Sequence, residues 1–507
     1  MRTIKCLIGI AAFSFVLSMA CVSFASGFSV LHEFAGDDTD GGLPYYGGLT
    51  LQGGVLYGVA SYGGPNWSGV AFRINPDGTG YSLLHAFGDP DIGGNGDGVL
   101  PYNSDLAYAD GKLYGTTFFG PTNIGTIWSV DTSGNNYSIV YDQFGNSFPA
   151  GRNLQAGLVI SGNNLYGITF DGGSGGGGTV FRVGTDGNNF AVLHPLDYYT
   201  EGGLSGGTLE LSGNTLYGMT GTGGPNDAGA LFKLGTDGSG FTLLHEFGDF
   251  AGDGEAPFGS VTCVGEYLYG MTCYGGTHSV GDGDGTLFRI GTDGSGYTIL
   301  KEFSSNSDGG AWPTGSLMYN AGMLYGMTSY EGPSGYGAIF RLDPENPGSF
   351  TVLYNFEDDA YGAGGDLVPY KGHLYGMTVG GPSSGNDAGV IFSLSTPEFD
   401  AIEDTYAGLG LDFTSAQMDD LTNLYYEGKN GLSPDPITIG DITWEYFGYT
   451  IEGKNPGDAW KEDGVYYFYL GSGVKGTAGG SGDVPEPSTL LLLLPFIGFG
   501  LRKLRRK

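Results

Sequence analysis

Cysteine, histidine and basic residues are scarce in this chain. Its 507 residues include 4 cysteines, 6 histidines and 20 lysines and arginines, against 54 aspartates and glutamates, and the formal net charge is −34. So acidic a surface repels nucleic acid and anionic lipid, and we expect neither as a partner. His278 and His373 have no cysteine or carboxylate at metal-ligand spacing, so no zinc site is predicted.

Glycine is abundant instead, with 100 residues. That content alone would suggest low complexity, but 40% of the residues are hydrophobic and 14% are aromatic, which is enough to fill the core of a folded domain.

A Leu-Tyr-Gly motif recurs along the chain at a period of about fifty residues, which is typical of propellers and solenoids. Successive tyrosines of the motif are 50 to 57 residues apart. There are seven copies, with their tyrosines at Tyr57, Tyr114, Tyr166, Tyr217, Tyr269, Tyr325 and Tyr375.

Each repeat contains four short apolar runs bounded by glycine, aspartate or asparagine. In the fourth copy these runs are 206–211, 216–220, 230–234 and 241–247. Such runs predict four antiparallel strands with tight connections, which is the composition of one propeller blade.

Two details of this copy give sharper expectations. Gly218 lies inside the second predicted strand, which indicates a close approach by another backbone. In the last strand we expect Phe241, Leu243 and Phe247 on one apolar face.

The last type of strand is out of phase with the others. Its first copy, 28–34, precedes the first Leu-Tyr-Gly motif, and no copy follows Phe392. A ring would join these two ends in one blade and remove the open edge that a linear stack leaves exposed. The sequence therefore predicts an all-β, seven-bladed propeller over 26–395, closed by its N-terminal strand.

The order of these elements resembles a kelch repeat. More specifically, the pattern Gly-x-x-Phe, Asp-Gly, Leu-His-x-Phe, Leu-Tyr-Gly-x-Thr resembles the GloVer-type tandem repeat of bacterial exported proteins, over roughly 28–395. That resemblance implies the fold and export, and it implies no activity.

The N-terminus has the three parts of a secretory signal peptide over residues 1–25. Arg2 and Lys5 precede an apolar run, which ends at the small-residue pattern Ser23-Phe24-Ala25. An alternative is a lipoprotein signal, in which Cys21 becomes the lipidated first residue.

Beyond the repeats, 396–472 is predicted to be a small β-rich module, with strands at 442–449 and 465–470. A Gly/Ser linker is expected at 473–483. In the module, Trp444, Tyr446, Tyr449, Tyr467 and Tyr469 form either a sugar-stacking face or a small core.

The C-terminal segment, 484–507, resembles a PEP-CTERM sorting signal. Pro485, Glu486 and Pro487 match its motif and precede an apolar run that reaches Leu501. A basic membrane stop then follows, comprising Arg502, Lys503, Arg505, Arg506 and Lys507. The resemblance implies an exosortase-type processing enzyme, transient insertion in the inner membrane of a Gram-negative bacterium, and a final place at the cell surface or outside the cell. An ordinary hydrophobic tail anchor is the alternative.

Histidines and acidic loops are the main candidates for chemistry. His32, His85, His194 and His245 occupy one repeat position, which favours an architectural role. Oxygen-rich loops at 37–41, 89–91 and 249–255 could hold Ca²⁺, but none has the full Asp-x-Asp-x-Asp-Gly spacing with a closing glutamate, and turn formation by aspartate and glycine is the favoured explanation.

Cys263 and Cys273 are the cysteines that remain after processing. They flank the hairpin of the fifth blade, and a turn centred near Glu266 would place Cys263 opposite Tyr269, on the same face as Cys273 but too far for a disulfide. An altered turn could bring them together.

No catalytic residue is predicted, because the blades look alike and carboxylates are spread over every rim loop. We expect an exported, monomeric, non-catalytic propeller that interacts with extracellular polysaccharide or a surface protein. The alternative is an extracellular propeller enzyme, a hydrolase or a lyase, that acts on polysaccharide.

Overall fold

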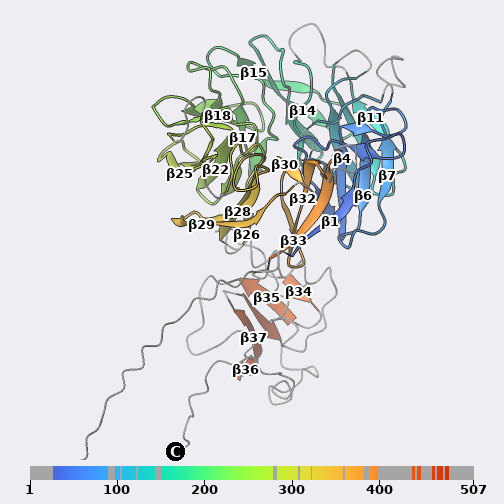
Figure 1. Cartoon of the computed structure of the whole chain (residues 1–507), viewed down its shortest axis with the longest axis vertical. Coiled ribbons are helices and arrows are strands. Elements are labelled where there is room, and N and C mark those ends of the chain that lie inside the picture. Colours follow the sequence, from blue (N-terminus) through green and yellow to red (C-terminus); the bar gives the residue numbers. More distant parts are fainter. Residues whose placement is uncertain are drawn as a thin grey trace, which may run out of the picture.

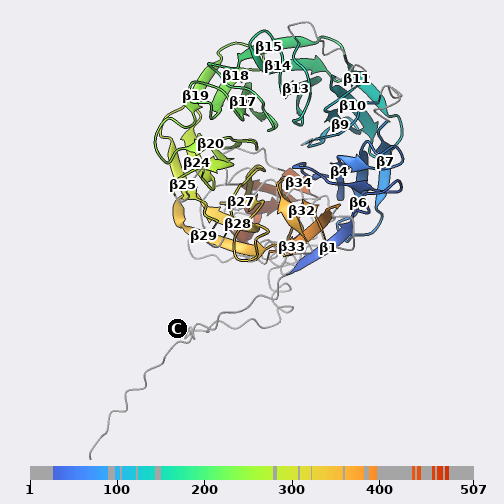
Figure 2. The same cartoon turned by 45° about the horizontal axis from the view of Figure 1, so that its top comes forward.

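Seven antiparallel sheets, six of four strands and one of five, form a closed ring in the computed structural model (Figure 1; Figure 2). The structure describes residues 27–396, apart from 89–96, 103–104, 121–123, 143–149, 278–282, 306–308, 321, 358–359 and 382–387, together with five strands between 437 and 478. The predicted signal peptide and sorting segment lie outside these residues.

Each blade runs from a short strand at the axis to a strand at the periphery. The innermost strands are β3 (Thr50–Gln52), β8 (Ala107–Ala109), β12 (Val159–Ser161), β16 (Glu210–Ser212), β21 (Thr262–Val264), β26 (Met318–Asn320) and β31 (Val368–Tyr370). The second strands are β4 (Val55–Ala60), β9 (Lys112–Thr117), β13 (Asn164–Ile168), β17 (Thr215–Thr220), β22 (Tyr267–Thr272), β27 (Met323–Thr328) and β32 (His373–Gly380). The third strands are β6 (Val70–Ile74), β10 (Thr126–Asp131), β14 (Gly176–Gly184), β18 (Ala230–Gly235), β24 (Thr286–Gly291), β28 (Ala338–Asp343) and β33 (Val390–Ser395). The outermost strands are β7 (Ser82–Ala86), β11 (Ser138–Tyr141), β15 (Ala191–Asp197), β19 (Thr242–Glu246), β25 (Thr298–Glu302), β29 (Asn346–Asn355) and β1 (Phe28–Glu33).

Shorter strands complete the description. β2 (Gly41–Gly42) pairs with β5 (Tyr62–Gly63), β20 (Gly254–Glu255) pairs with β23 (Tyr274–Gly275), and β30 (Tyr361–Ala363) pairs with β32. A separate five-stranded sheet has the order β34 (Ile437–Ile439), β35 (Ile442–Tyr446), β38 (Val474–Ala478), β37 (Val465–Gly471), β36 (Ala459–Glu462). β38 continues this sheet into the segment predicted as a linker.

The ring closes through the N-terminal strand, as predicted. β1 pairs antiparallel with β33, with Phe28 opposite Leu394 and Glu33 opposite Val390. The Phe28 ring stacks on Tyr354 of the sixth blade, with 4.2 Å between ring centroids, and on Phe392 of its own blade at 5.3 Å. The closing strand is therefore held by side-chain packing as well as by its backbone ladder.

The glycine of the Leu-Tyr-Gly motif makes room for an aromatic ring. Gly218 lies opposite Phe232 on the neighbouring strand, and a Cβ on this glycine would be 2.5 Å from Phe232 Cζ and 2.7 Å from Leu209 Cδ2. The expected close approach is thus by side chains, and the expectation of a backbone contact was wrong. The same contact recurs in the other blades, in the pairs Gly58–Phe72, Gly115–Trp128, Gly167–Phe181, Gly270–Phe288, Gly326–Phe340 and Gly376–Phe392.

A bulge in the outer strand overturns the predicted facing of Phe247. Leu231 pairs with His245 but Phe232 pairs with Leu243, so one extra residue, Leu244, interrupts the alternation. Phe247 consequently packs in the cluster between the fourth and fifth blades, whereas Leu243 packs toward the third.

The innermost strands are shorter than predicted. In the fourth blade the strand covers 210–212, whereas the sequence predicted 206–211. There a Cβ on Gly207 would collide with the carbonyl oxygen of Gly259 in the next blade, and a Cβ on Gly259 would collide with that of Gly315. Glycine is required where neighbouring blades approach this closely.

The shared glycine–phenylalanine contact generates a prediction. Gly218→Ala should lower the free energy of unfolding by about 1–3 kcal/mol, because the added methyl overpacks the site against Phe232. Urea denaturation followed by circular dichroism measures the change. Gly348→Ala in β29 is the control, since its Cβ would meet only the end of the Asn346 side chain at 3.7 Å. Equal effects in both variants would contradict the proposed cause.

Candidate binding site at the channel mouth

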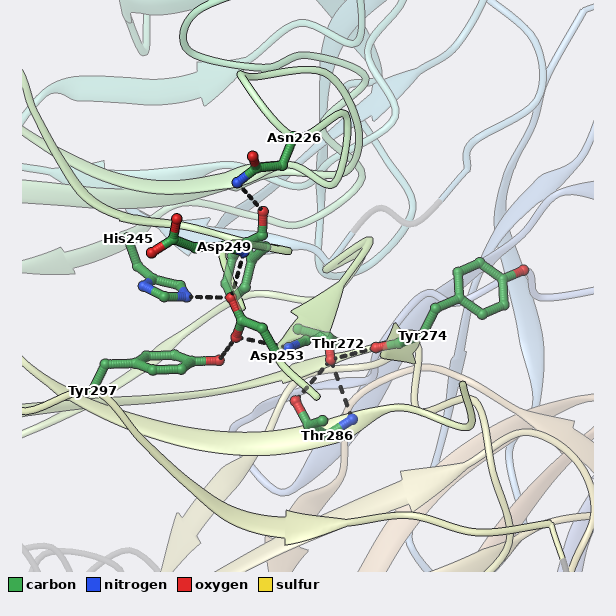
Figure 3. Close-up of polar contacts among 10 residues, drawn as sticks. Asn226, His245, Asp249, Asp253, Thr272, Tyr274, Thr286 and Tyr297 are labelled. Atoms are coloured by element: carbon green, nitrogen blue, oxygen red, sulfur yellow. Dashed lines mark hydrogen bonds and ion pairs between the residues drawn. The ribbon is translucent and has the colours of Figure 1, made fainter. Parts of the chain in front are cut away.

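The four equivalent histidines join neighbouring blades. In the clearest case, His245 Nε2 lies 3.0 Å from Asp253 Oδ2, and the imidazole stacks on Tyr297 of the fifth blade with 3.7 Å between ring centroids (Figure 3). The Tyr297 hydroxyl donates to Asp253 Oδ1. The equivalent groups are His32 with Asp40 and Tyr81, His85 with Asp97 and Tyr137, and His194 with Glu201 and Phe241. Their predicted architectural role agrees with this geometry.

The acidic loops supply the carboxylates of these contacts. Asp40 and Asp253 accept hydrogen bonds from a histidine, from a tyrosine and from backbone amides in their own loops. Burial alone would raise the pKa of Asp253, but the hydrogen bonds from His245 and Tyr297 outweigh it and leave this pKa below the usual value. Within the described part of the chain, no three histidine, cysteine or acidic side chains are grouped to hold a metal ion. Residues 89–91 lie outside that part.

Aromatic side chains from three blades surround a pocket at one end of the channel. The pocket has a volume of about 300 Å³ and is lined by Tyr46, Gln155, Phe258, Cys273, Tyr274, Trp312, Thr314 and Tyr330. Trp312 lies edge-to-face with both Tyr274 and Tyr330, with ring centroids 6.1 and 5.5 Å apart, and it remains 37% exposed.

The backbone fixes these rings. Tyr274 lies in β23, which pairs with β20, and its carbonyl accepts a hydrogen bond from the Thr272 hydroxyl (Figure 3). The Trp312 amide donates to the Asp284 carbonyl. Tyr46 adopts a left-handed conformation with φ of 51°, and its ring occupies the space where Gly364 lacks a Cβ. A bulky residue in that region carries strain of about 1–3 kcal/mol, a cost found most often at functional sites.

Two carboxyl groups lie beneath this pocket, at the axis. Asp105 and Asp366 line a smaller cavity of about 10 Å³, which shares Tyr46, Phe258 and Thr314 with the aromatic pocket. Asp105 accepts hydrogen bonds from the Gly48 amide at 2.7 Å and from the Thr208 hydroxyl at 3.4 Å, and Asp366 accepts one from the Ser316 amide at 2.8 Å. Burial raises the pKa of both carboxyl groups, and the neighbouring Asp366 raises that of Asp105 further.

The thiol of Cys273 faces the same pocket but is inert. Burial raises its pKa to about 12, so the nucleophilic thiolate is not populated at neutral pH. Both described cysteines are free. Cys263 pairs with Leu268 and not, as predicted, with Tyr269. The hairpin turn is centred between Gly265 and Glu266 instead of on Glu266. In this register Cys273 lies on the opposite face of the hairpin from Cys263.

Other residues proposed from the sequence lie away from this site or outside the described residues. His373 is partly exposed, and its ring is within hydrogen-bond distance of the Lys371 carbonyl. Of the aromatic residues predicted in the C-terminal module, the structure gives only the backbone of β35 and β37. His278, the sorting motif at 485–487 and the basic membrane stop are not described. None of the described residues belongs to a helix long and apolar enough to cross a membrane.

The sequence matches a known repeat family. The Gloeobacter/Verrucomicrobia repeat matches residues 92–282 and 253–425, which together make up more than half of the chain. The chain belongs to this family. No protein of curated function matches it significantly.

Solved structures match this Gloeobacter/Verrucomicrobia repeat protein at low identity. An oligogalacturonate lyase in complex with manganese is 13% identical, with 70% of this chain and 90% of that chain covered and a TM-score of 0.45. The oligogalacturonate lyase of Vibrio parahaemolyticus is 11% identical, with coverage of 73% and 94% and a TM-score of 0.44. A GH74 enzyme of Niastella koreensis is 14% identical, with coverage of 69% and 52% and a TM-score of 0.42. Similarity this distant gives no argument about ligand or activity.

Sequence reasoning missed the pocket because its residues come from different repeat positions. Tyr46, Phe258 and Thr314 precede innermost strands, whereas Tyr274 and Tyr330 follow second strands. One signal was available: the residue six places after the motif leucine is aromatic in only some blades, as at Tyr62, Tyr274 and Tyr330, and is Thr222 in the fourth.

The contact between His245, Asp253 and Tyr297 predicts a pH-dependent loss of stability. Asp253→Asn should lower the free energy of unfolding at pH 7 by about 1–3 kcal/mol, because a partly buried histidine and a partly buried tyrosine lose a charged partner. The pKa of Asp253 is lowered in the folded state, so its contribution is complete above the unfolded value of about 4 and disappears as the pH falls below it. Denaturant titrations at several pH values measure the difference.

Asp249→Asn is the matched control in the same loop. Its carboxylate is exposed and only its backbone amide bonds to Asp253, so we expect a change within about 0.5 kcal/mol. A deficit of Asp253→Asn that stays constant down to pH 3 would show that charge is not its source.

The axial carboxyl pair predicts the opposite pH dependence. The pKa of Asp105 is raised in the folded state, so the folded protein loses stability as the pH rises above the unfolded value of about 4. Asp105→Asn removes this cost while its side-chain oxygen can still accept from the Gly48 amide. We expect its melting temperature to exceed that of the wild type at pH 7, on the order of 2 °C or more, and the gain to shrink toward pH 4.

Differential scanning calorimetry at these two pH values measures the gain. Asp110→Asn, at an exposed turn of the same blade, should change neither value. A melting temperature below that of the wild type at pH 7 would contradict the prediction.

Proposed function

We propose that the protein is an exported, non-catalytic repeat protein, sorted by an exosortase-type enzyme, that binds extracellular polysaccharide at the mouth of its channel. The observation that carries the proposal is the pocket of about 300 Å³ walled by aromatic rings. That size falls at the lower end of the range for small-molecule sites, which are concave, mostly apolar and equipped with a few polar groups.

The arrangement of the pocket suits a sugar. Rings such as Trp312 and Tyr330 present apolar faces on which the C–H face of a pyranose can stack, while Gln155 and Thr314 offer hydrogen-bonding groups for its hydroxyls. Both rings are more than a third exposed, at 37% and 42%, although apolar surface of this size is normally buried. Retaining them at a concave surface is consistent with a ligand that covers them.

Export is supported by sequence alone. The signal-peptide pattern of 1–25 and the sorting motif at 485–487 occur at opposite ends of one chain, and the acidic composition suits a solvated extracellular surface. We infer that the propeller crosses the inner membrane, is held there transiently by its C-terminal segment, and acts at the cell surface or beyond as a monomer.

One observation favours the alternative, an extracellular polysaccharide hydrolase or lyase. Asp105 and Asp366 converge beneath the pocket, and such pairs carry acid–base chemistry in many enzymes. Against hydrolysis, the two carboxyl groups are hydrogen-bond neighbours. Glycosidases separate theirs by about 5–5.5 Å or 6.5–9.5 Å to leave room for the sugar or for a water molecule. The non-catalytic proposal therefore stands first.

The proposal predicts binding that depends on the pocket tryptophan. The full-length protein should retain one or more polysaccharides on a glycan array without releasing products, and Trp312→Ala should weaken that binding at least ten-fold because it removes a stacking face. Isothermal titration calorimetry measures affinity, and chromatography of the incubated polysaccharide detects turnover.

Trp67→Ala is a closely matched control. Trp67 is also exposed, at 60%, and has nearly the same backbone conformation, with φ of 59° against 57° for Trp312, but it does not line the pocket. Equal loss in both variants, or no binding to any polysaccharide, would overturn the proposal. Products that disappear in Asp366→Asn would establish the enzyme instead.

A further inference from the structure

The aromatic pocket and the axial carboxyl cavity adjoin one another. Tyr46, Phe258 and Thr314 line both, so a ligand held between the rings lies next to the cavity that contains the carboxyl groups. The lower cavity, at about 10 Å³, has room for one group the size of a water molecule. The site therefore has wide aromatic walls and a narrow polar base.

The charge of this site has one sign. Asp105 and Asp366 are the ionisable acids at its base, beside the hydroxyls of Thr208, Ser260 and Ser316. Among the residues that the structure describes, no lysine, arginine or histidine lines either cavity. An anionic sugar would meet no opposite charge from these lining residues, whereas a cation would favour the ionised form of the carboxyl groups and gain Coulomb energy in a partly desolvated site.

The walls also favour a cation. Five rings line the pocket, from Tyr46, Phe258, Tyr274, Trp312 and Tyr330. The face of an aromatic ring is electronegative and attracts an ammonium group, by about 0.5–2 kcal/mol depending on desolvation. Rings above carboxylates are the arrangement that recognises an organic ammonium ion.

We propose that the channel mouth binds hexosamine units with a free amino group, in a partly or fully de-N-acetylated polysaccharide. The pyranose stacks on Trp312, which Tyr330 supports edge-to-face, and its protonated amine enters the lower cavity beside the adjoining carboxyl groups of Asp105 and Asp366. An N-acetyl group is both uncharged and too large for that cavity. This inference rests on the proposed polysaccharide-binding function and names the ligand class for the same site.

A sugar fits the walls better than a lysine side chain of a protein partner would. Gln155 places an amide group beside the rings, and the methylene stem of lysine offers this amide no hydrogen-bond partner. The hydroxyls of a pyranose ring satisfy such groups while its apolar face stacks.

The test compares two oligosaccharides that differ only in acetylation. The full-length protein is titrated with the tetramer of glucosamine and with the tetramer of N-acetylglucosamine, at about 0.15 M salt to screen non-specific attraction. We expect the dissociation constant for the amino form to be at least ten-fold lower. In Asp366→Asn this preference should fall toward unity, while Asp110→Asn keeps it. Trp312→Ala should weaken binding of the amino form at least ten-fold.

The other outcomes separate this inference from the function on which it rests. Equal binding of the two tetramers, or binding only of other neutral polysaccharides, overturns amine recognition and leaves polysaccharide binding intact. Tetralysine that binds as tightly as the amino sugar, without loss in Trp312→Ala, overturns the inference in favour of a basic protein partner or surface charge. Absence of binding to any glycan overturns both.

Discussion

The contact on which the propeller depends is the one between the motif glycine and the aromatic ring of the next strand. In each blade the ring of the third strand lies across the glycine of the second, as Phe232 lies across Gly218. The ring is buried completely in this position, and the glycine also lies against the leucine or valine just before the innermost strand, as Gly218 does against Leu209. The aromatic side chain of the third strand and the glycine of the second, which has no side chain, thus fix the register of the inner part of a blade. This explains why the chain repeats Leu-Tyr-Gly so faithfully while other positions vary.

Blades must also be joined to each other, and polar contacts contribute where apolar packing ends. The bulge after Leu243 turns His245 toward the next blade, where it stacks on Tyr297 while Asp253 binds both side chains. Because the carboxylate accepts from each partner, the buried polar atoms satisfy one another. The same arrangement at His32 and Tyr81 crosses the junction between the closing strand and the first blade. Closure of the ring therefore uses the same contact as its interior joints.

The sequence predicts these repeated features well and the site poorly, for one physical reason. Blade number, strand order and the pairing of 28–33 with 390–394 follow from periodicity, because a periodic sequence encodes contacts between equivalent residues. Periodicity does not predict the bulge. Simple alternation places Phe247 on the same face as Leu243, whereas the observed strand pairing places the two residues on opposite faces. Periodicity also fails to predict the pair Asp105 and Asp366. They are 261 positions apart, and the other blades carry glycine, serine or threonine at the equivalent position. Nothing local marks them as neighbours.

Those same departures from the repeat are what can create a specific site in a symmetric ring. Seven identical blades would present seven identical residues to the axis, and such a surface would offer a ligand no single preferred position. At the position before the buried leucine or valine of the innermost strand, two blades carry aspartate while Thr208, Ser260 and Ser316 occupy others. Above them the aromatic residues come mainly from the fifth and sixth blades, joined by Tyr46 from the first. The carboxyl pair raises the free energy of the folded state at neutral pH and Tyr46 is strained, so neither feature is explained by stability. Residues that cost stability and converge on one pocket are most simply explained by a ligand that uses them.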